Sequence, residues 1–339
     1  MNTLPLTSPA PLLDVRQLQV AFQTRQGLLP ITRDVSFTVM PGERIALVGE
    51  SGCGKTVTGL SLMRLLPADV ARVSGQVLLQ GTDLLQLPER QMRAVRGRDV
   101  AMIFQEPMSA LDPVFTVGEQ IAEAYRVHFP DRAQEARDRT LQVLEQVGIP
   151  LPQQRYHEYP HQLSGGMRQR VMIAMALICE PKLLIADEPT TALDVTVQAQ
   201  ILRLLRELSE RTGTALLFIT HDLGVVAETC TRMVTMYAGE VVEDAPVDDA
   251  LIEPRHPYTS GLLRSLPRFS PRRAPLAFIP GRVPAPGTLP EGCRFQPRCA
   301  HANESCQAPQ VLQAIDTQHR RVRCGRAPEL ELPGVPTHG

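Results

Sequence analysis

The chain has 339 residues, a formal net charge of −1 and a hydrophobic content of 43%. At roughly 150 residues per domain this length predicts about two domains, and the apolar content excludes a chain that is disordered throughout. The near-zero charge argues against a protein that coats nucleic acid by neutralising phosphates. The longest apolar run, residues 171–179, is much shorter than the roughly 20 residues of a membrane helix, so no segment is expected to span a bilayer.

Taken in chain order, the apolar runs alternate between strand and helix patterns. Short runs predict buried strands at residues 44–49, 182–187 and 215–220. Apolar residues at helical spacing over 201–208 predict a helix that ends at Gly213. A region from about residue 106 to 181 contains helical patterns and is expected to form a helical insertion. This order predicts an α/β fold with a parallel sheet, whose functional groups lie at the carboxyl ends of its strands.

The segment after the first predicted strand matches the P-loop pattern, Gly49-Glu50-Ser51-Gly52-Cys53-Gly54-Lys55-Thr56. Its glycines let successive backbone N–H groups point at phosphate oxygens. Lys55 can bring a cation to the β- and γ-phosphates, and the Thr56 hydroxyl can bind Mg²⁺. A helix expected from Val57 to Leu66 would direct its positive end at the same anions. The sequence therefore predicts a P-loop NTPase fold.

Polar residues end the other two predicted strands. Asp187 and Glu188 follow the second strand, and in P-loop NTPases an Asp at this place holds the Mg²⁺ shell. Glu188 points away from Asp187 in an extended chain, so it can accept a proton from the attacking water. His221 follows the third strand, where it can reach a γ-phosphate. These side chains predict an ATP- or GTP-hydrolysing site.

Further motifs narrow the class. The string Leu163-Ser164-Gly165-Gly166-Met167 precedes a predicted helix and offers a second anion site. It resembles the signature motif of ATP-binding cassette proteins. Gln105 in Phe104-Gln105-Glu106-Pro107 resembles their Q-loop, and Thr191-Ala192-Leu193-Asp194 resembles their D-loop. The motifs also follow the order of that family, from P-loop to His221.

The resemblance implies two cassettes that dimerise head to tail around two ATP molecules. Ser164, Gly165, Gly166 and the D-loop residue Asp194 would then contribute to the site of the partner's nucleotide. Gln105 would sense Mg²⁺ and couple it to a membrane partner. Phe22 is the candidate for stacking on adenine, although the segment between it and the P-loop is long for the family.

A closer resemblance is to the ATPase subunits of dipeptide and oligopeptide importers. It is carried by the run from Tyr159 to Asp194 and by Arg255-His256-Pro257-Tyr258-Thr259, which in that group opens a C-terminal extension. It predicts a nucleotide-binding domain at residues 12–250 and an extension at 251–339. It also implies two permease subunits, a substrate-binding protein and a second ATPase subunit, for which a different chain is favoured and a second copy of this chain is the alternative. The chain would lie peripherally on the cytoplasmic face of the inner membrane. Relatives carry dipeptides, longer oligopeptides, nickel complexes or haem, and the sequence leaves the choice among these cargoes open.

The C-terminal part has a composition of its own. Fourteen of the 30 prolines and four of the seven cysteines, Cys293, Cys299, Cys306 and Cys324, follow residue 253. The first thirteen residues lack the basic residues of a secretory signal, so a reducing compartment and a metal site are favoured over disulfides. A Cys₄ zinc site, an iron–sulfur cluster and no metal are the alternatives. The resemblance favours a 4Fe–4S cluster. Cys53, Cys179 and Cys230 are expected to be ordinary apolar or loop positions.

Two other functions remain as hypotheses. One is a soluble cassette ATPase that acts on ribosomes or DNA, although such proteins usually carry two cassettes, long insertions or a basic tail. The other is a cassette that binds ATP without cleaving it. The single cassette and the near-zero charge favour no role with nucleic acid. The presence of Lys55, Asp187, Glu188 and His221 favours hydrolysis over ATP binding alone.

Overall fold

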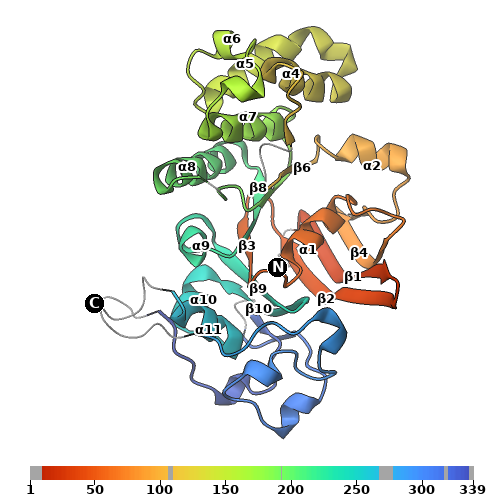
Figure 1. Cartoon of the computed structure of the whole chain (residues 1–339), viewed down its shortest axis with the longest axis vertical. Coiled ribbons are helices and arrows are strands. Elements are labelled where there is room, and N and C mark those ends of the chain that lie inside the picture. Colours follow the sequence, from red (N-terminus) through yellow and green to blue (C-terminus); the bar gives the residue numbers. More distant parts are fainter. Residues whose placement is uncertain (1–9, 106–109, 192, 267–277, 317–319, 336–339) are drawn as a thin grey trace, which may run out of the picture.

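The computed structural model describes residues 10–105, 110–191, 193–266, 278–316 and 320–335. The molecule is elongated: helices α4 to α7 lie at one end, strands β3 and β6 to β10 lie in the middle, and the C-terminal residues lie at the other end (Figure 1). We refer to the described residues up to 250 as the body and to those from 251 onward as the extension.

An eight-stranded sheet lies at the centre of the molecule, in the order β11-β12-β10-β9-β3-β8-β7-β6, and its strands β11 and β12 come from the extension. Strands β9, β3, β8, β7 and β6 run parallel, whereas β10, β12 and β11 are antiparallel to their neighbours. The expected α/β fold with a parallel sheet is confirmed. The bounds are β3 (Arg44–Val48), β6 (Val100–Ile103), β7 (Leu183–Asp187), β8 (Ala215–Thr220), β9 (Arg232–Tyr237), β10 (Glu240–Pro246), β11 (Gln313–Ala314) and β12 (Arg321–Val322).

A second sheet of four antiparallel strands, which the sequence analysis does not predict, lies beside the first. Its order is β2-β1-β4-β5. Bulges interrupt the pairing of β1 with both of its neighbours, and such irregularities obscure the period-two alternation by which a strand is recognised. The bounds are β1 (Leu13–Thr24), β2 (Gly27–Val39), β4 (Ala71–Leu79) and β5 (Thr82–Asp83).

Helices cover the central sheet and extend beyond it. Helix α8 buries its face at Ile201, Leu202, Leu205 and Leu208 and ends at Gly213, which has a φ of 71°. The α-helices are α1 (Lys55–Leu62), α2 (Glu89–Val95), α4 (Val117–His128), α5 (Ala136–Gln146), α6 (Pro152–Arg155), α7 (Gly165–Leu177), α8 (Val195–Thr212), α9 (Leu223–Thr229), α10 (Val247–Ile252) and α11 (Pro257–Arg264). The 3₁₀ helices are η1 (Pro130–Glu135), η2 (Pro160–Gln162), η4 (Pro286–Thr288), η5 (Gln296–Arg298), η6 (Glu304–Gln307) and η7 (Ala327–Glu329).

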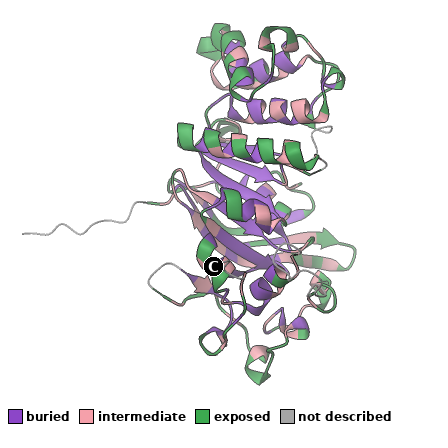
Figure 2. Ribbon diagram, turned by 90° about the vertical axis from the view of Figure 1, so that its left-hand side faces the viewer, coloured by how far each residue is buried: buried purple, intermediate pink, exposed green. Residues whose placement is uncertain are grey.

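The core is concentrated in the central strands, which Figure 2 shows as the most continuously buried part of the molecule. Every residue of β6, β7 and β8 is buried, as the continuous apolar runs predict. Cys53, Cys179 and Cys230 are buried among apolar side chains. This rigid sheet fixes the positions of the loops at its carboxyl edge.

The four cysteines of the extension line one small cavity of about 10 Å³. Within the described ranges, however, no group of three or more His, Cys, Asp or Glu side chains is placed so that it could hold a metal ion. The prediction of an iron–sulfur or other metal site at Cys293, Cys299, Cys306 and Cys324 is therefore wrong. Burial raises the pKa of Cys293 to about 11 and also raises the pKa of Cys299 and Cys324.

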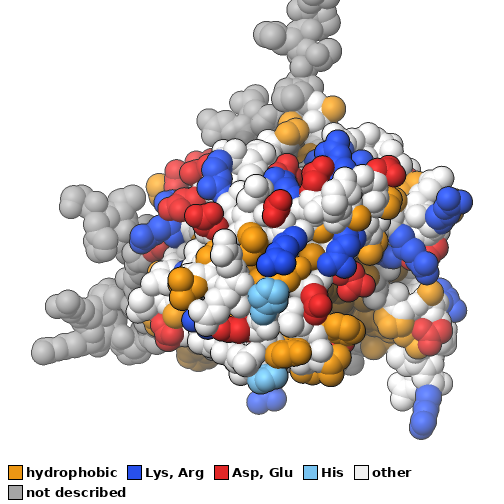
Figure 3. All heavy atoms as spheres, turned by 90° about the horizontal axis from the view of Figure 1, so that it is seen from above, with side chains coloured by type: hydrophobic (Ala, Val, Ile, Leu, Met, Phe, Trp, Pro, Cys, Tyr) orange, Lys and Arg blue, Asp and Glu red, His pale blue; other side chains and the backbone are white. Residues whose placement is uncertain are grey.

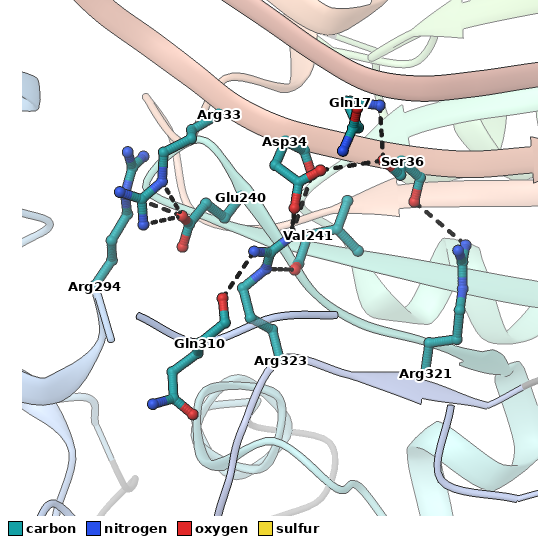
Figure 4. Close-up of polar contacts among 10 residues, drawn as sticks. All are labelled: Gln17, Arg33, Asp34, Ser36, Glu240, Val241, Arg294, Gln310, Arg321 and Arg323. Carbon is teal, nitrogen blue, oxygen red and sulfur yellow. Dashed lines mark hydrogen bonds and ion pairs between the residues drawn. The ribbon is translucent and has the colours of Figure 1, made fainter. Parts of the chain in front are cut away.

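The extension is attached to the body by the pairing of β12 with β10 and by buried arginines (Figure 4). The Arg323 guanidinium donates to the Val241 carbonyl at 2.9 Å and pairs with the Asp34 carboxylate at 2.9 Å. Arg294 lies 3.4 Å from the Glu240 carboxylate. Because the planar guanidinium offers five donors, one arginine can join backbone and carboxylate acceptors from several elements.

Candidate functional site

The P-loop joins β3 to α1. Gly54 is the N-terminal cap of α1 with a φ of 100°, and Gly49 has a φ of 152°. A Cβ atom at position 49 would lie 2.2 Å from the Met236 carbonyl oxygen of β9. Glycine is therefore required here both for the backbone conformation and for the close approach of β9.

Substitution of Gly49 by alanine is expected to destabilise the loop by about 1–3 kcal/mol and to weaken nucleotide binding. The matched control is Gly27→Ala, because Gly27 also has a positive φ but faces open space. Urea unfolding and a nucleotide titration measure the two effects. Equal losses in both variants would show that the contact with β9 is unimportant.

Lys55 is buried inside the loop, with 5% of its surface exposed. Its Nζ donates hydrogen bonds to the carbonyl oxygens of Gly49 at 2.8 Å and Glu50 at 3.1 Å. Ser51 and Thr56 are exposed, and Val57 is half-buried in the first turn of α1. The polar side chains of Ser51 and Thr56 thus lie at the surface of the loop, whereas the Lys55 ammonium lies buried within it.

Thr56 and Asp187 bring two oxygen donors together from different elements. The Thr56 hydroxyl donates to the Asp187 carboxylate at 3.3 Å. Burial raises the pKa of Asp187, although the hydrogen bond from Thr56 acts in the opposite direction. A hydroxyl and a carboxylate are the hard ligands that Mg²⁺ prefers, so these residues fit a magnesium site beside the P-loop.

Glu188 is the centre of a hydrogen-bonded cluster at the carboxyl edge of the sheet. Its Oε2 accepts from Gln105 Nε2 and from Thr191 Oγ1, both at 3.0 Å. Its Oε1 lies 3.0 Å from Nδ1 of His221. Glu188 itself has a φ of 44°, a conformation that is uncommon outside glycine and recurs at functional sites. The structure therefore brings the predicted residues Gln105, Glu188 and His221 together.

The hydrogen bond from Thr191 to Glu188 was not predicted, because the sequence pattern places Thr191 only in the D-loop motif. Burial acts to raise the pKa of Glu188, but the hydrogen bonds from His221 and Thr191 outweigh it and hold the pKa below its ordinary value. The carboxylate is therefore ionised at neutral pH and able to accept a proton.

The signature residues lie at the start of α7. This helix belongs to the group of helices at one end of the molecule (Figure 1). Ser164 caps α7 by accepting from the Met167 N–H, and Asp194 caps α8 by accepting from the Val197 N–H. Among the hydrogen bonds of the described residues, none joins residues 164–166 to loop 49–56. Residues 106, 107 and 192 of the Q-loop and D-loop motifs lie outside the described residues.

Phe22 lies on β1 opposite Leu29 of β2 and is half-buried. The role of Phe22 in stacking on adenine stays a prediction. Taken together, a P-loop after β3, an Asp-Glu pair after β7 and a histidine after β8 define a P-loop nucleoside triphosphatase.

Two family models match the chain. Residues 32–191 match the ABC transporter family. Residues 242–306 match the C-terminal region of oligopeptide/dipeptide transporters. The second match spans the junction between the body and the extension.

The chain is also similar to curated proteins along nearly its whole length. A putative peptide import ATP-binding protein of Brucella ovis is 50% identical, with 95% of this chain and 99% of that protein covered. A probable peptide ABC transporter ATP-binding protein of Sinorhizobium fredii is 52% identical, with coverage of 94% and 96%. The chain therefore belongs to the ABC transporter family.

Solved structures agree with this assignment. A dimeric bacterial ABC transporter cassette has a TM-score of 0.61 at 25% identity and covers 69% of this chain and 98% of its own. The same cassette has been solved in a post-hydrolysis state bound to ADP and Pi, with the same TM-score of 0.61. The chain is an ABC-type ATPase subunit. Of the helices that the structure describes, none has the length and hydropathy needed to cross a membrane.

Proposed function

We propose that this chain hydrolyses ATP to drive peptide import, as one of two ATPase subunits that act head to tail on two permease subunits. The observation that carries the proposal is the similarity to peptide import ATP-binding proteins over 95% of the chain. The match of residues 242–306 to the oligopeptide/dipeptide transporter C-terminal region supports the same substrate class. The body, residues 12–250, would be the nucleotide-binding domain, and residues 251–339 its extension.

In this proposal different side chains at the carboxyl edge of the sheet have different roles in hydrolysis. Lys55 neutralises the β- and γ-phosphates of ATP. Glu188 accepts the proton of the attacking water, since its carboxylate is ionised and lies beside Gln105 and His221 at 3.0 Å. His221 then contacts the γ-phosphate. Bound Mg²⁺ would supply charge neutralisation at the phosphates, with Thr56, Asp187 and Gln105 as the residues that hold it.

The signature residues serve the nucleotide of a partner subunit. Ser164 accepts from the Met167 N–H in the first turn of α7, and in this proposal the preceding N–H groups of the helix bind an anion. In this proposal a head-to-tail dimer supplies the phosphate that residues 164–166 bind. Among the hydrogen bonds of the described residues, none joins them to this chain's own P-loop. Asp194 lies at the start of the neighbouring helix α8 and belongs to the same interface.

An apolar groove supports docking on a permease. It has a volume of about 320 Å³ and lies between the end of α1, β6 and the helices α4 and α7. Leu65 and Phe104 line it and are 38% and 41% exposed. Phe104 directly precedes Gln105, which contacts Glu188. An apolar permease segment in this groove would therefore contact Phe104, the neighbour in sequence of Gln105. Gln105 belongs to the hydrogen-bonded cluster around Glu188, which we call the hydrolytic cluster.

Substitution Leu65→Glu is expected to weaken binding to the permease by about tenfold or more, because an unpaired charge would be buried at the interface. Leu28→Glu is the matched control: Leu28 is 58% exposed on β2 and does not line the groove. Co-purification of the membrane complex, followed by its peptide-stimulated ATP turnover, measures the effect. If both variants assemble like the unaltered chain, the groove is not the permease site.

The remaining partners follow from the same proposal. The second ATPase subunit is a different chain, a substrate-binding protein delivers the peptide, and the complex lies at the cytoplasmic face of the inner membrane. Figure 3 shows basic, acidic and apolar side chains interspersed over the helical end of the molecule. This mixture does not favour the alternative of an ATPase that acts on ribosomes or DNA, since binding to phosphate backbones requires clustered cations.

A further inference from the structure

The P-loop residue Glu50 is held by a side chain from the extension. Arg298 Nη1 lies 2.7 Å from Glu50 Oε2, and Arg298 Nη2 lies 3.0 Å from Glu50 Oε1. This is the bidentate geometry in which arginine and carboxylate pair most strongly. The side chain of Arg298 is 4% exposed and that of Glu50 is 31% exposed. A contact between residues 248 positions apart thus fixes the loop that binds phosphate.

Arg298 is itself held in place by several contacts. Its Nε donates to the Pro280 carbonyl at 2.8 Å, and its guanidinium lies 5.7 Å from the centre of the Tyr237 ring. Tyr237 packs against Tyr258 and Phe295, with ring centroids 4.7 and 5.1 Å away. The guanidinium therefore cannot move without disturbing an aromatic cluster that joins β9 of the body to Tyr258 and Phe295 of the extension.

The backbone of Glu50 is held as well. Its N–H donates to the hydroxyl of Tyr258 at 2.8 Å, and Tyr258 is fully buried in α11. Its carbonyl oxygen accepts from Lys55 Nζ at 3.1 Å. A continuous chain of contacts therefore runs from Arg298 and Tyr258 through Glu50 to the lysine that meets the phosphates.

A cavity beside the P-loop is lined both by residues of the extension and by His221 of the hydrolytic cluster. It has a volume of about 220 Å³ and is lined by Gly49, Glu50 and Ser51 of the P-loop, by His221 and by Leu262 and Leu266. Leu262 belongs to α11, and Leu266 follows that helix. The extension thus borders the P-loop at the end where His221 lies.

We propose that Arg298 and Tyr258 are positioning residues for ATP binding, which hold the P-loop in its phosphate-binding conformation through Glu50. A loop that is ordered before its ligand arrives loses less conformational entropy on binding, so its affinity is higher. The extension is then a working part of the ATP site. This inference rests on ATP binding by the chain and does not depend on peptides as the cargo or on the permease partners.

The test is a double-mutant cycle on the full chain, with the affinity for a fluorescent ATP analogue as the readout. Arg298→Gln and Glu50→Gln are each expected to weaken binding by about tenfold, and the double variant is expected to be no weaker than either, because coupled residues are not additive. Arg298→Lys should recover only part of the affinity, since an ammonium cannot make the bidentate pair. In steady-state turnover, the KM for ATP should rise while kcat changes little.

Arg323→Gln is the matched control. Arg323 is also a buried extension arginine paired with a carboxylate of the body, Asp34, but it does not contact the P-loop. Its affinity for the analogue should stay within about twofold of the unaltered chain. Equal losses for Arg298→Gln and Arg323→Gln, or additive losses in the cycle, would overturn the inference. Because Glu50 is partly exposed, Glu50→Gln keeps the test valid even if Arg298→Gln fails to fold.

The same titration separates this inference from the assignment of the nucleotide site. Failure of the unaltered chain to bind the analogue would overturn both the P-loop assignment and the positioning role. Normal binding that is insensitive to Arg298 and Glu50 would overturn the positioning role alone. Peptide transport by the assembled complex has no influence on either result.

Discussion

Glu188→Gln is expected to lower ATP turnover by about 10²–10⁴-fold, which is the usual contribution of a general base, while ATP affinity stays close to that of the unaltered chain. Glutamine has nearly the same shape and can still accept from Gln105 and Thr191, which lie 3.0 Å from Glu188 Oε2. It cannot accept a proton from water. Single-turnover hydrolysis by the assembled complex measures the chemical step directly.

Glu207→Gln provides the control, because Glu207 lies exposed on α8, outside the hydrolytic cluster. It should leave turnover unchanged. Wild-type turnover by Glu188→Gln would place the base elsewhere. If the unaltered complex binds ATP without cleaving it, the hypothesis of a non-catalytic cassette becomes the better account.

Glu240→Ala is expected to lower the free energy of unfolding by about 3–5 kcal/mol, because removal of one partner leaves a buried charge without compensation. Glu240 and Arg294 are 3% and 5% exposed, and Arg33 also donates to Glu240 at 2.6 Å. Figure 4 shows both guanidinium groups directed at this carboxylate. Urea unfolding and amide hydrogen exchange of β10 would report the loss.

A paired substitution shows whether the loss of stability in Glu240→Ala comes from the unpaired charge or from lost packing. Changing Glu240 and Arg294 together to methionine should recover most of the lost stability, because apolar replacements of a buried ion pair are often neutral. Glu329→Ala is the surface control: Glu329 is 66% exposed and pairs with Arg326 within the extension, so a loss below about 1 kcal/mol is expected. A similarly small loss for Glu240→Ala would mean that this pair does not attach the extension.

Much of the body could be predicted from local patterns. The strands predicted at residues 44–49, 182–187 and 215–220 correspond to β3, β7 and β8 to within one residue at each end. These strands are buried on both faces, so their apolar runs are uninterrupted. The P-loop is equally visible, because its glycines and its lysine must follow one another at fixed spacing.

Other features depend on contacts that no local pattern contains. The bulged strands β1 and β2 lack a regular alternation. Thr191 reaches Glu188 only because the chain turns at Glu188, whose φ is 44°. The prediction of a metal site from the cysteine spacing was wrong, since spacing along the chain does not determine how the side chains are placed relative to one another.

The amino-acid sequence by itself determined the class of protein and predicted the residues of a nucleotide site, because phosphate binding requires particular residue types at short spacing. Only the tertiary structure decided how the extension is attached and what it contacts. Arg298 and Glu50 are 248 positions apart, and so are paired by the packing of β9, α11 and the extension. Ion pairs between distant residues carry no local signature, so the link between the extension and the P-loop emerged only with the fold.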